Sequence, residues 1–156
     1  MQTVFINSPL GITKIVGDEN GISIISILQE GEVSAKIPKE LKEAVQQLQQ
    51  YFEGKRSNFN FKLNPKGTEF QQKVWQGLLE IPFGKTMSYL ELSKKLGDVK
   101  AIRAVASANG KNPLWIVIPC HRVIGTDGSL TGYAGGLWRK KWLLEHENPT
   151  NQQSLF

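Results

Sequence analysis

The sequence predicts an α+β protein with a small N-terminal sheet-plus-helix domain and a mainly helical C-terminal domain. Short runs of alternating apolar residues occupy the first thirty positions, helical periodicity dominates the remainder, and a polar, proline-broken stretch separates the two. The chain has 156 residues, of which 40% are hydrophobic, so it can form one core or two small ones. We therefore expect domains at residues 1–63 and 64–149, followed by a C-terminal tail at 150–156.

The first domain is predicted to contain a meander of three strands and one helix. The strands, each bounded by Gly, Pro, Asn or Asp, are expected at residues 3–7, 11–16 and 22–28. A helix follows Pro38 and ends at Gly54, because apolar residues recur at helical spacing between them. Its apolar face should cover the sheet. The polar segment 55–66, broken by Pro65, is typical of a linker between domains.

Two capping boxes, at Thr68 and Ser88, mark the starts of helices in the second domain. The first of these helices should end before Pro82, and the second is short. Asp98 can cap a third helix over about residues 99–109. Two short helices joined this tightly indicate a helix-turn-helix.

The third of these helices has a small, basic face that suits a nucleic-acid partner. Its members are Lys100, Arg103, Ala104, Ser107 and Lys111. Residues 64–156 carry twelve Lys/Arg and seven Asp/Glu, which accounts for the whole net charge of +5. Small side chains let the backbone approach a phosphate-lined groove, into which Arg103 can project. The alternative is that the alanines only favour helix and the basic residues are solvated.

Composition excludes several classes of protein. Cys120 is the only cysteine and the chain has two histidines, so neither a disulfide framework nor the usual structural zinc site can form. No apolar run approaches the ~20 residues that a membrane span needs. The N-terminus also lacks the basic-then-apolar layout of a signal peptide. We therefore expect a cytoplasmic protein that does not enter a membrane.

A reactive segment is predicted after the apolar run at residues 114–118, which is short enough to be a buried strand. Pro119 forces a change of direction there, and this places Cys120 and His121 where core meets surface. Neighbouring side chains of a regular strand point to opposite faces, so cooperation between thiol and imidazole requires a turn or a bridging water. The alternative is that Cys120 is a small buried hydrophobe and His121 a turn residue.

A base is needed because the thiolate is the competent nucleophile and a free cysteine has a pKa near ~8.5. His121 can take the proton from Cys120. A carboxylate on the other ring nitrogen would fix the tautomer and stabilise the imidazolium. Glu145 and Glu147, at the end of a predicted helix that starts near Leu137, are the candidates.

Four further segments occur in order along the second domain. They are Asn112-Pro113, residues 119–124 (PCHRVI), residues 131–137 (TGYAGGL) and residues 142–144 (WLL). In these segments the sequence resembles the O6-alkylguanine-DNA alkyltransferases, or methylated-DNA–protein-cysteine methyltransferases, and the likeness extends over residues 66–147. The resemblance implies a winged helix-turn-helix-like C-terminal domain that carries the active site. It also implies direct repair of O6-alkylguanine in double-stranded DNA.

The resemblance implies a role for each matching catalytic residue. Cys120 would accept the alkyl group from O6 of guanine, and also from O4 of thymine. His121 would deprotonate Cys120 through a water, and Glu147 would orient His121. Asn112 would brace the turn that presents the thiol, and Tyr89 would donate a proton or hydrogen bond to guanine N3.

The resemblance also implies contacts to DNA and to the flipped base. Arg103 would fill the gap that the flipped nucleotide leaves in the duplex. The other DNA-binding residues would be Ser88, Lys100, Ala104 and Ser107. The base and alkyl pocket would be formed by Trp115, Val123, Tyr133, Ala134 and Asn109, with backbone N–H groups around Ala134 holding O6. Because a smaller residue or proline stands at the Trp115 position in relatives that accept bulky groups, we expect a narrow pocket that favours methyl over benzyl.

The chemistry predicts that each molecule reacts once. A thioether on Cys120 is not undone by thiol exchange, and no second cysteine could resolve it. Water, His121 and a thiolate suffice, so we expect no metal and no organic cofactor. We also expect a monomer, because a small protein that flips one base needs no symmetry.

The last five residues, Gln152 to Phe156, resemble the pentapeptide by which bacterial repair and replication proteins dock on the sliding clamp. The Leu-Phe pair could fill a hydrophobic pocket of that partner. It could equally fold back onto its own protein.

Two other functions compete with alkyl transfer. In a winged-helix DNA-binding module Cys120 would be structural, which leaves the Pro-Cys-His-Arg segment unexplained. A cysteine hydrolase would use Cys120 and His121, but the sequence has no recognisable oxyanion motif and such an enzyme has no use for the basic helix.

Overall fold

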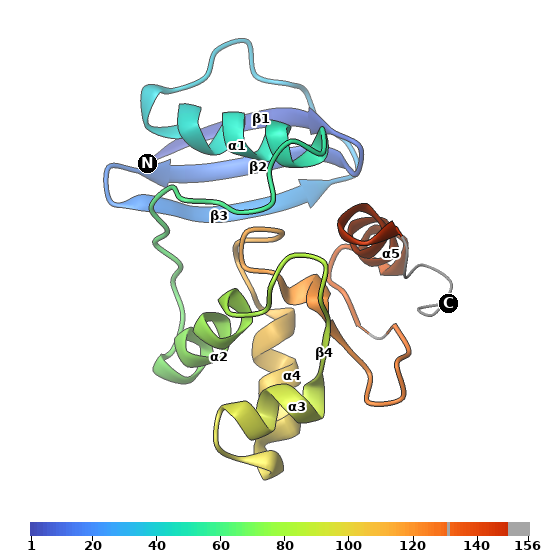
Figure 1. Cartoon of the computed structure of the whole chain (residues 1–156). Coiled ribbons are helices and arrows are strands. Elements are labelled where there is room, and N and C mark those ends of the chain that lie inside the picture. The colour runs from blue at the N-terminus through green and yellow to red at the C-terminus, as the bar shows by residue number, and fades with distance from the viewer. Residues whose placement is uncertain (131, 150–156) are drawn as a thin grey trace. The chain divides into compact units, whose positions relative to one another are not determined.

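The computed structural model describes residues 1–130 and 132–149 of the chain. The described chain divides into two compact units, the first built from residues 1–66 together with 113–117, and the second from residues 67–112 together with 118–130 and 132–149. The predicted α+β fold is confirmed, with a small sheet and a helix in the first unit and a mainly helical second unit (Figure 1). None of the helices in the described part of the chain is long and apolar enough to cross a bilayer.

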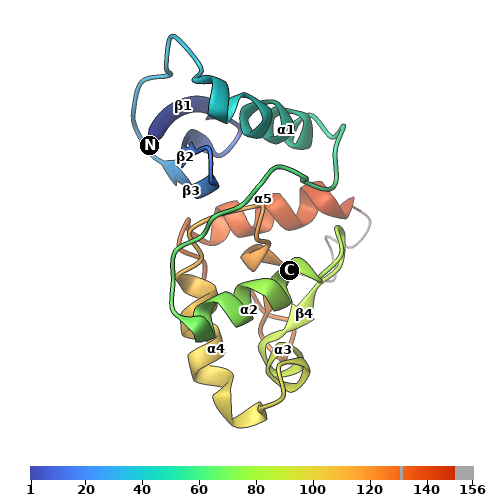
Figure 2. The ribbon, with the colours of Figure 1, turned by 90° about the vertical axis from the view of Figure 1, so that its left-hand side faces the viewer.

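The first unit is an antiparallel meander covered by one helix, as predicted. β1 (Gln2–Ser8), β2 (Gly11–Asp18) and β3 (Gly21–Leu28) pair in chain order. A 3-10 turn, η1 (Lys39–Leu41), leads into α1 (Lys42–Phe52), which lies against one face of the sheet (Figure 2). The alternation of apolar residues along the strands and their helical spacing in α1 form the core. Its buried members include Val4, Ile6, Ile15, Ile25, Leu41, Val45, Leu48 and Tyr51.

The outer edge of β3 is paired with two segments that are distant in sequence. Ile22 exchanges backbone hydrogen bonds of 2.9 and 2.7 Å with segment 62–64. Further along, Ile25 exchanges bonds of 2.8 and 3.0 Å with segment 113–115. These pairings satisfy backbone groups that an edge strand would otherwise present to solvent.

The prediction of a strand at residues 114–118 is wrong. The run has one isolated bridge, between Leu114 and Ile25, and the residues after Leu114 form turns and not a strand. Ile116 has a φ of 75°, in the left-handed region that a β-branched residue rarely adopts. The apolar run is therefore buried as a compact turn, which periodicity cannot distinguish from a short buried strand.

The segment predicted as a linker is also part of the first unit. The Phe59 ring lies 5.5 Å from that of Tyr51, and Phe59 in turn contacts Phe61 with centroids 5.9 Å apart. Its asparagines and Pro65 suggested a solvated connection, but these aromatic side chains pack on the end of α1 and hold the segment in place.

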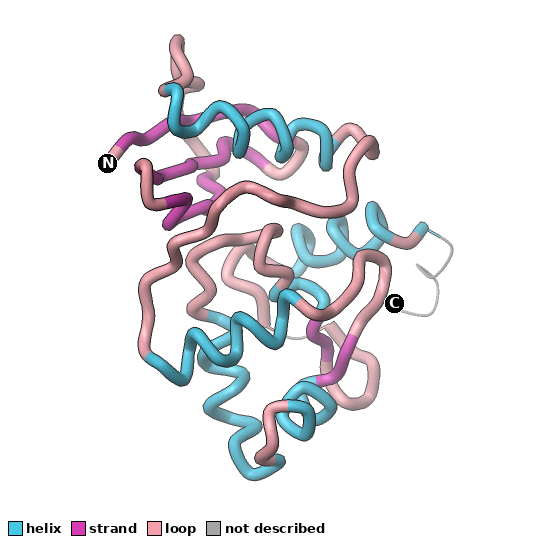
Figure 3. The backbone as a smooth tube through the Cα atoms, turned by 60° about the vertical axis from the view of Figure 1, so that its left-hand side comes forward, coloured by secondary structure: helices cyan, strands magenta, loops and turns pink. Residues whose placement is uncertain are grey.

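The second unit contains the predicted helix-turn-helix (Figure 3). α3 (Tyr89–Lys95) is joined through a 3-10 turn, η2 (Val99–Ala101), to α4 (Ile102–Gly110), while α2 (Glu69–Leu79) packs against both. The Trp75 indole N–H of α2 donates to the carbonyl of Ala108 in α4 at 2.8 Å. This bond satisfies the one polar atom of a large buried ring and fixes α2 on α4.

Local capping fixes the helix starts as predicted. The Thr68 hydroxyl accepts from the Gln71 N–H at 3.1 Å, and the Ser88 hydroxyl accepts from the Glu91 N–H at 3.0 Å. The Asp98 carboxylate accepts from the Lys100 N–H. On α2, however, Phe70 and Leu79 are each 39% exposed, so its apolar face is narrower than predicted.

A short parallel pairing connects the helix-turn-helix to the cysteine segment. β4 (Met87–Ser88) immediately precedes α3, and it pairs with β5 (Val123–Ile124). The 3-10 turn η3 (Cys120–Arg122) ends where β5 begins. The last helix, α5 (Leu137–Glu147), packs on η3. The first residues of α3 and the reactive segment are thereby held in a fixed register.

Candidate active site

Cys120 and His121 lie in the single turn η3, which follows Pro119. The Cys120 N–H donates to the Ile118 carbonyl at 2.8 Å, and the cysteine is only 5% exposed. The predicted turn after the proline is therefore present. In a 3-10 turn, neighbouring side chains are not forced to opposite faces as they are in a strand.

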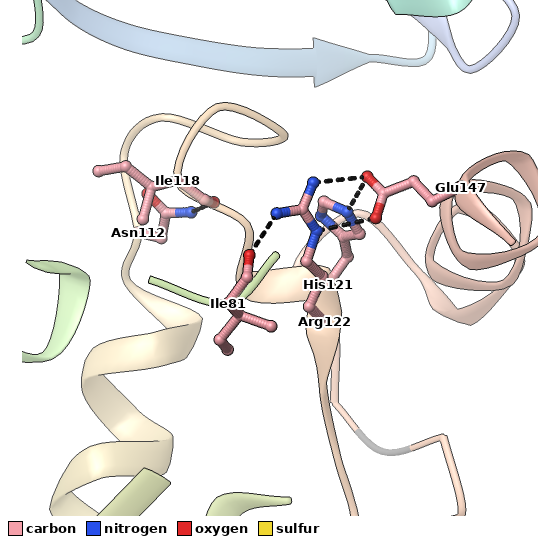
Figure 4. Close-up of polar contacts among 6 residues, drawn as sticks. All are labelled: Ile81, Asn112, Ile118, His121, Arg122 and Glu147. Carbon is pink, nitrogen blue, oxygen red and sulfur yellow. Dashed lines mark hydrogen bonds and ion pairs between the residues drawn. The ribbon is translucent and has the colours of Figure 1, made fainter. Parts of the chain in front are cut away.

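The His121 ring contacts the carboxylate of Glu147, which reaches it from the last turn of α5 (Figure 4). His121 Nε2 lies 2.8 Å from Glu147 Oε2, and both side chains are almost completely buried. The other candidate, Glu145, instead faces Lys141 at 4.0 Å on the same helix. Of the two carboxylates proposed from sequence, the structure therefore brings Glu147 to the imidazole.

Arg122 holds the same carboxylate from the other side. Its Nε donates to Glu147 Oε1 at 2.8 Å and its Nη2 donates to Glu147 Oε2 at 3.1 Å. Its Nη1 donates to the Ile81 carbonyl at 2.7 Å, and the guanidinium lies over the Phe83 ring. A bidentate pair of this kind fixes the position of the carboxylate as well as its charge.

These contacts determine the protonation of the site. Burial alone would raise the pKa of Glu147, but the charge and hydrogen bond of His121, together with those of Arg122, hold that pKa well below its usual range. An ionised carboxylate only accepts hydrogen bonds, so His121 Nε2 carries the proton of their contact. In the neutral ring Nδ1 is then the acceptor. Nδ1 is buried, and no group among the described residues hydrogen bonds to it.

Asn112 braces the cysteine segment. Its Nδ2 donates to the Ile118 carbonyl at 2.7 Å, and the Asn112 side chain is buried (Figure 4). Burial raises the pKa of the Cys120 thiol to about 11, although a hydrogen bond from Asn112 and the charge of Lys140 act in the opposite direction. At neutral pH the resting thiol is therefore protonated and needs a base.

Lys140 is a member of this site that the sequence did not suggest. It lies in the first turn of α5 and is fully buried. Burial lowers the pKa of Lys140 to about 8, and the charge of Cys120 opposes that shift. The sequence signal was present, because Arg139 and Lys140 place two cations at a helix N-terminus, where the helix dipole favours acidic residues.

A cavity of about 450 Å³ lies between the helix-turn-helix and the segment before α5. It is large enough for a nucleobase. Its lining residues are Tyr89, Ala106, Asn109, Gly110, Gly132, Tyr133 and Ala134. The structure thus brings together Tyr89, Asn109, Tyr133 and Ala134, as the resemblance implied.

Two predicted pocket residues are not among those that line this cavity. Val123 is fully buried in β5. Trp115 belongs to the first unit, where it pairs with Ile25. The expectation of a narrow alkyl pocket at Trp115 stays a prediction.

The face of α4 expected to meet DNA is exposed. Arg103, Ala104 and Ser107 project from α4, and Lys100 precedes it in η2. Ser88, by contrast, is buried at the start of α3, with its oxygen occupied by the Glu91 N–H. Thr131 of the 131–137 segment and the tail residues Gln152–Phe156 lie outside the described part of the chain.

Comparisons with known proteins agree with this arrangement. Residues 69–149 match the family model described as 6-O-methylguanine DNA methyltransferase, DNA binding domain, and residues 1–65 match the model of the same family described as its ribonuclease-like domain. The methylated-DNA–protein-cysteine methyltransferase of Methanosarcina barkeri is 46% identical over 149 residues, which are 91% of this chain and 94% of that protein.

Solved structures show the same fold. The crystal structure of the Mycobacterium tuberculosis O6-methylguanine methyltransferase has a TM-score of 0.85 and 41% identity, and the match covers 95% of this chain and 93% of that one. The structure of the Mycobacterium tuberculosis protein OGT in complex with DNA also has a TM-score of 0.85 and 41% identity, and it covers 99% of this chain and 94% of that one.

Proposed function

We propose that Cys120 is the residue that accepts the alkyl group when this protein repairs alkylated DNA. The premise is that the chain belongs to the 6-O-methylguanine DNA methyltransferase family. Family membership makes the chain a DNA alkyltransferase, an enzyme of DNA repair. The buried Cys120–His121–Glu147 arrangement is the observation that carries the assignment of residues. A DNA-bound relative of the same fold supports DNA as the partner.

In the proposed reaction, the Cys120 thiolate attacks the alkyl carbon on O6 of guanine. A carbon–sulfur bond forms, the carbon–O6 bond breaks, and the electron pair of the broken bond passes to the base. The thiol proton moves through a water to Nδ1 of His121, whose other nitrogen is held by Glu147. The base takes up one proton, equivalent to the one that the thiol has lost to His121. The products are therefore unmodified guanine, a neutral His121 and an S-alkylated Cys120, which cannot react again.

The leaving base needs a donor, and Tyr89 is the proposed one. It lines the cavity, and its hydroxyl oxygen lies 3.5 Å from Asn109 Nδ2. A phenol that donates to guanine N3 would neutralise charge that develops on the base as the carbon–O6 bond breaks. The backbone around Ala134 would contact O6 from the opposite wall.

DNA would bind to the exposed face of α4. Arg103 would occupy the gap left by the extruded nucleotide, while Lys100, Ala104 and Ser107 contact the duplex backbone. Ser88, at the start of α3, would add a phosphate contact. O4-alkylthymine is a second proposed substrate, because it presents an alkyl group on an equivalent exocyclic oxygen.

The experiment that tests this function is mass spectrometry of the intact protein and its peptides after incubation with duplex DNA carrying one O6-methylguanine. We expect one methyl group per molecule, on the Cys120 peptide, and none in Cys120→Ala. Glu147→Gln should react more slowly, because the amide cannot stabilise the imidazolium. DNA binding without any gain in mass would instead favour the DNA-binding module.

Three further expectations accompany the proposal. The protein would act as a monomer and in the cytoplasm. Its tail at Gln152–Phe156 would dock on the replication sliding clamp. Deletion of residues 152–156 with unchanged clamp binding would refute the tail's role.

A further inference from the structure

Tyr133 and Ala134 line the cavity, and their segment ends in a turn at Gly135–Gly136. This turn has a single internal backbone hydrogen bond, which the Gly136 N–H donates to the Tyr133 carbonyl at 2.9 Å. Gly136 has a φ of 91°, which requires glycine. It also serves as the N-cap of α5 without a side-chain cap. The position of the cavity wall therefore depends on groups outside the turn.

Arg139 supplies such a group. Its Nη1 donates to the Gly135 carbonyl at 2.7 Å, and the residue is only 8% exposed. Side chains of a helix lean toward its N-terminus, so a residue in the first turn of α5 is well placed to reach back to this carbonyl. A charge-assisted hydrogen bond in a buried setting is among the stronger polar contacts a turn can have.

Trp138 covers the same guanidinium. The Arg139 Cζ lies 4.5 Å from the centroid of the Trp138 ring, and a Cβ built on Gly136 would lie 3.6 Å from that ring. Trp138 itself is 55% exposed, although tryptophan is on average a largely buried residue. The Trp138 ring therefore covers the guanidinium on its solvent side, and this cation–π contact holds Arg139 against the turn.

This arrangement is not explained by the stability of the helix. Arg139 and Lys140 are both buried in the first turn of α5, which contains no acidic residue. The positive end of the helix dipole disfavours cations there. Residues that lower the stability of a helix in this way are typically residues that serve a functional site and not the fold.

We propose that Arg139 is a positioning residue for alkyl transfer. Its guanidinium, covered by the Trp138 ring, fixes the cavity wall formed by residues 132–134. This inference rests on the proposed function, since it assigns the wall to the flipped base. Arg139 acts through the backbone of the turn and does not touch the reacting atoms. Burial of Tyr133 and the charge of Cys120 raise the pKa of Tyr133, and the charge of Arg139 acts in the opposite direction.

The test measures methyl transfer from duplex DNA carrying one O6-methylguanine, in single turnovers with protein in excess over a range of concentrations. We expect Arg139→Met to lower the saturating rate constant by roughly ten- to a hundredfold, as small misplacements of a bound group do. The half-saturating concentration should change much less, because the exposed DNA-binding face is intact. Arg139→Lys, which keeps a charge and a donor but not the planar group, should fall between.

Lys141→Met is the matched control, since it makes the same chemical change at the next position of α5. The Lys141 side chain is about half exposed and faces Glu145, so this variant should react like the wild type. A second readout is the reaction of Cys120 with a small aromatic disulfide in the absence of DNA. We expect Arg139→Met to leave that rate within about twofold of wild type, because the nucleophile itself is not altered.

Trp138→Ala and Trp138→Phe keep the test informative if Arg139→Met fails to fold. Loss of an exposed ring leaves the core in place, so Trp138→Ala should fold and transfer slowly, and Trp138→Phe should retain most of the rate. Wild-type saturating rates in Arg139→Met or Trp138→Ala would overturn the inference. An equal loss of the DNA-dependent and DNA-independent rates would overturn it as well, whereas a wild-type chain that transfers no methyl would refute the proposed function itself.

Discussion

Single residues carry most of the chemistry, and the sequence identified some of them more readily than others. Cys120 and His121 are adjacent, so their placement in one turn could be predicted once Pro119 indicated a change of direction. Glu147 could be predicted because it ends a helix, although its choice over Glu145 required the resemblance. Two cations at a helix N-terminus marked Lys140 as unusual, but its proximity to Cys120 arises from the packing of α5 on η3 and could not be predicted.

The role of Lys140 gives a prediction about pH. Lys140→Met should raise the pKa of Cys120 above its value of about 11, because removing a nearby cation disfavours the thiolate. At a fixed pH below 8, reaction of Cys120 with iodoacetamide should then slow by up to roughly tenfold, which corresponds to one pKa unit. The difference should shrink as the pH rises through the Lys140 pKa of about 8, where the wild type also loses this charge.

The measurement is the alkylation rate of the free protein against pH, followed by the mass of the Cys120 peptide. Lys141→Met, which changes an exposed cation on the same helix, should follow the wild-type curve. An unchanged or faster reaction in Lys140→Met would show that the cation does not favour the thiolate.

At the scale of elements, the helices of the second unit were predicted well because their ends are encoded locally. The capping boxes at Thr68 and Ser88 are fixed by residues three positions apart, so the sequence alone contains the information. The run at 114–118 was predicted wrongly because its turn conformation depends on the pairing of Leu114 with Ile25, a contact that no local pattern reveals.

The two capping boxes allow helix capping to be separated from DNA contact. Ser88→Ala and Thr68→Ala should each cost about 1 kcal/mol of stability, since each removes one capped backbone N–H. Only Ser88→Ala should also weaken binding to duplex DNA, by several-fold to roughly tenfold, because Ser88 and not Thr68 is proposed to contact a phosphate. Urea unfolding and fluorescence anisotropy with a labelled duplex measure the two effects. Equal losses of affinity in both variants would attribute the effect of Ser88 to stability.

At the scale of the whole molecule, the general order of a sheet unit followed by a helical unit could be predicted from the change in periodicity. The return of residues 113–117 to the first unit could not be predicted, because the sequence of a five-residue apolar run does not indicate which segment it packs against. The chain therefore passes between its two units three times.

This path predicts which unit each buried leucine stabilises. Leu114→Ala should accelerate hydrogen exchange at the Ile25 amide, whose acceptor is the neighbouring Pro113 carbonyl, by destabilising the first unit by about 2–5 kcal/mol. Leu92→Ala, an equally buried leucine of α3, should instead accelerate exchange in α4. Native-state hydrogen exchange read by mass spectrometry distinguishes the two. Faster exchange in α4 than in β3 after Leu114→Ala would contradict the division into units.

The same path of the chain predicts where mutations that abolish repair should fall in the gene. Only two residues, Ile118 and Pro119, separate the reactive cysteine from a stretch whose backbone is anchored on β3. In a genetic screen for sensitivity to alkylating agents, damaging alleles should therefore cluster at the codons around Ile25 as well as at those of the reactive turn. Such alleles would look like unrelated stability mutations on a linear map of the gene, although they act on the anchor of the segment that leads into Cys120.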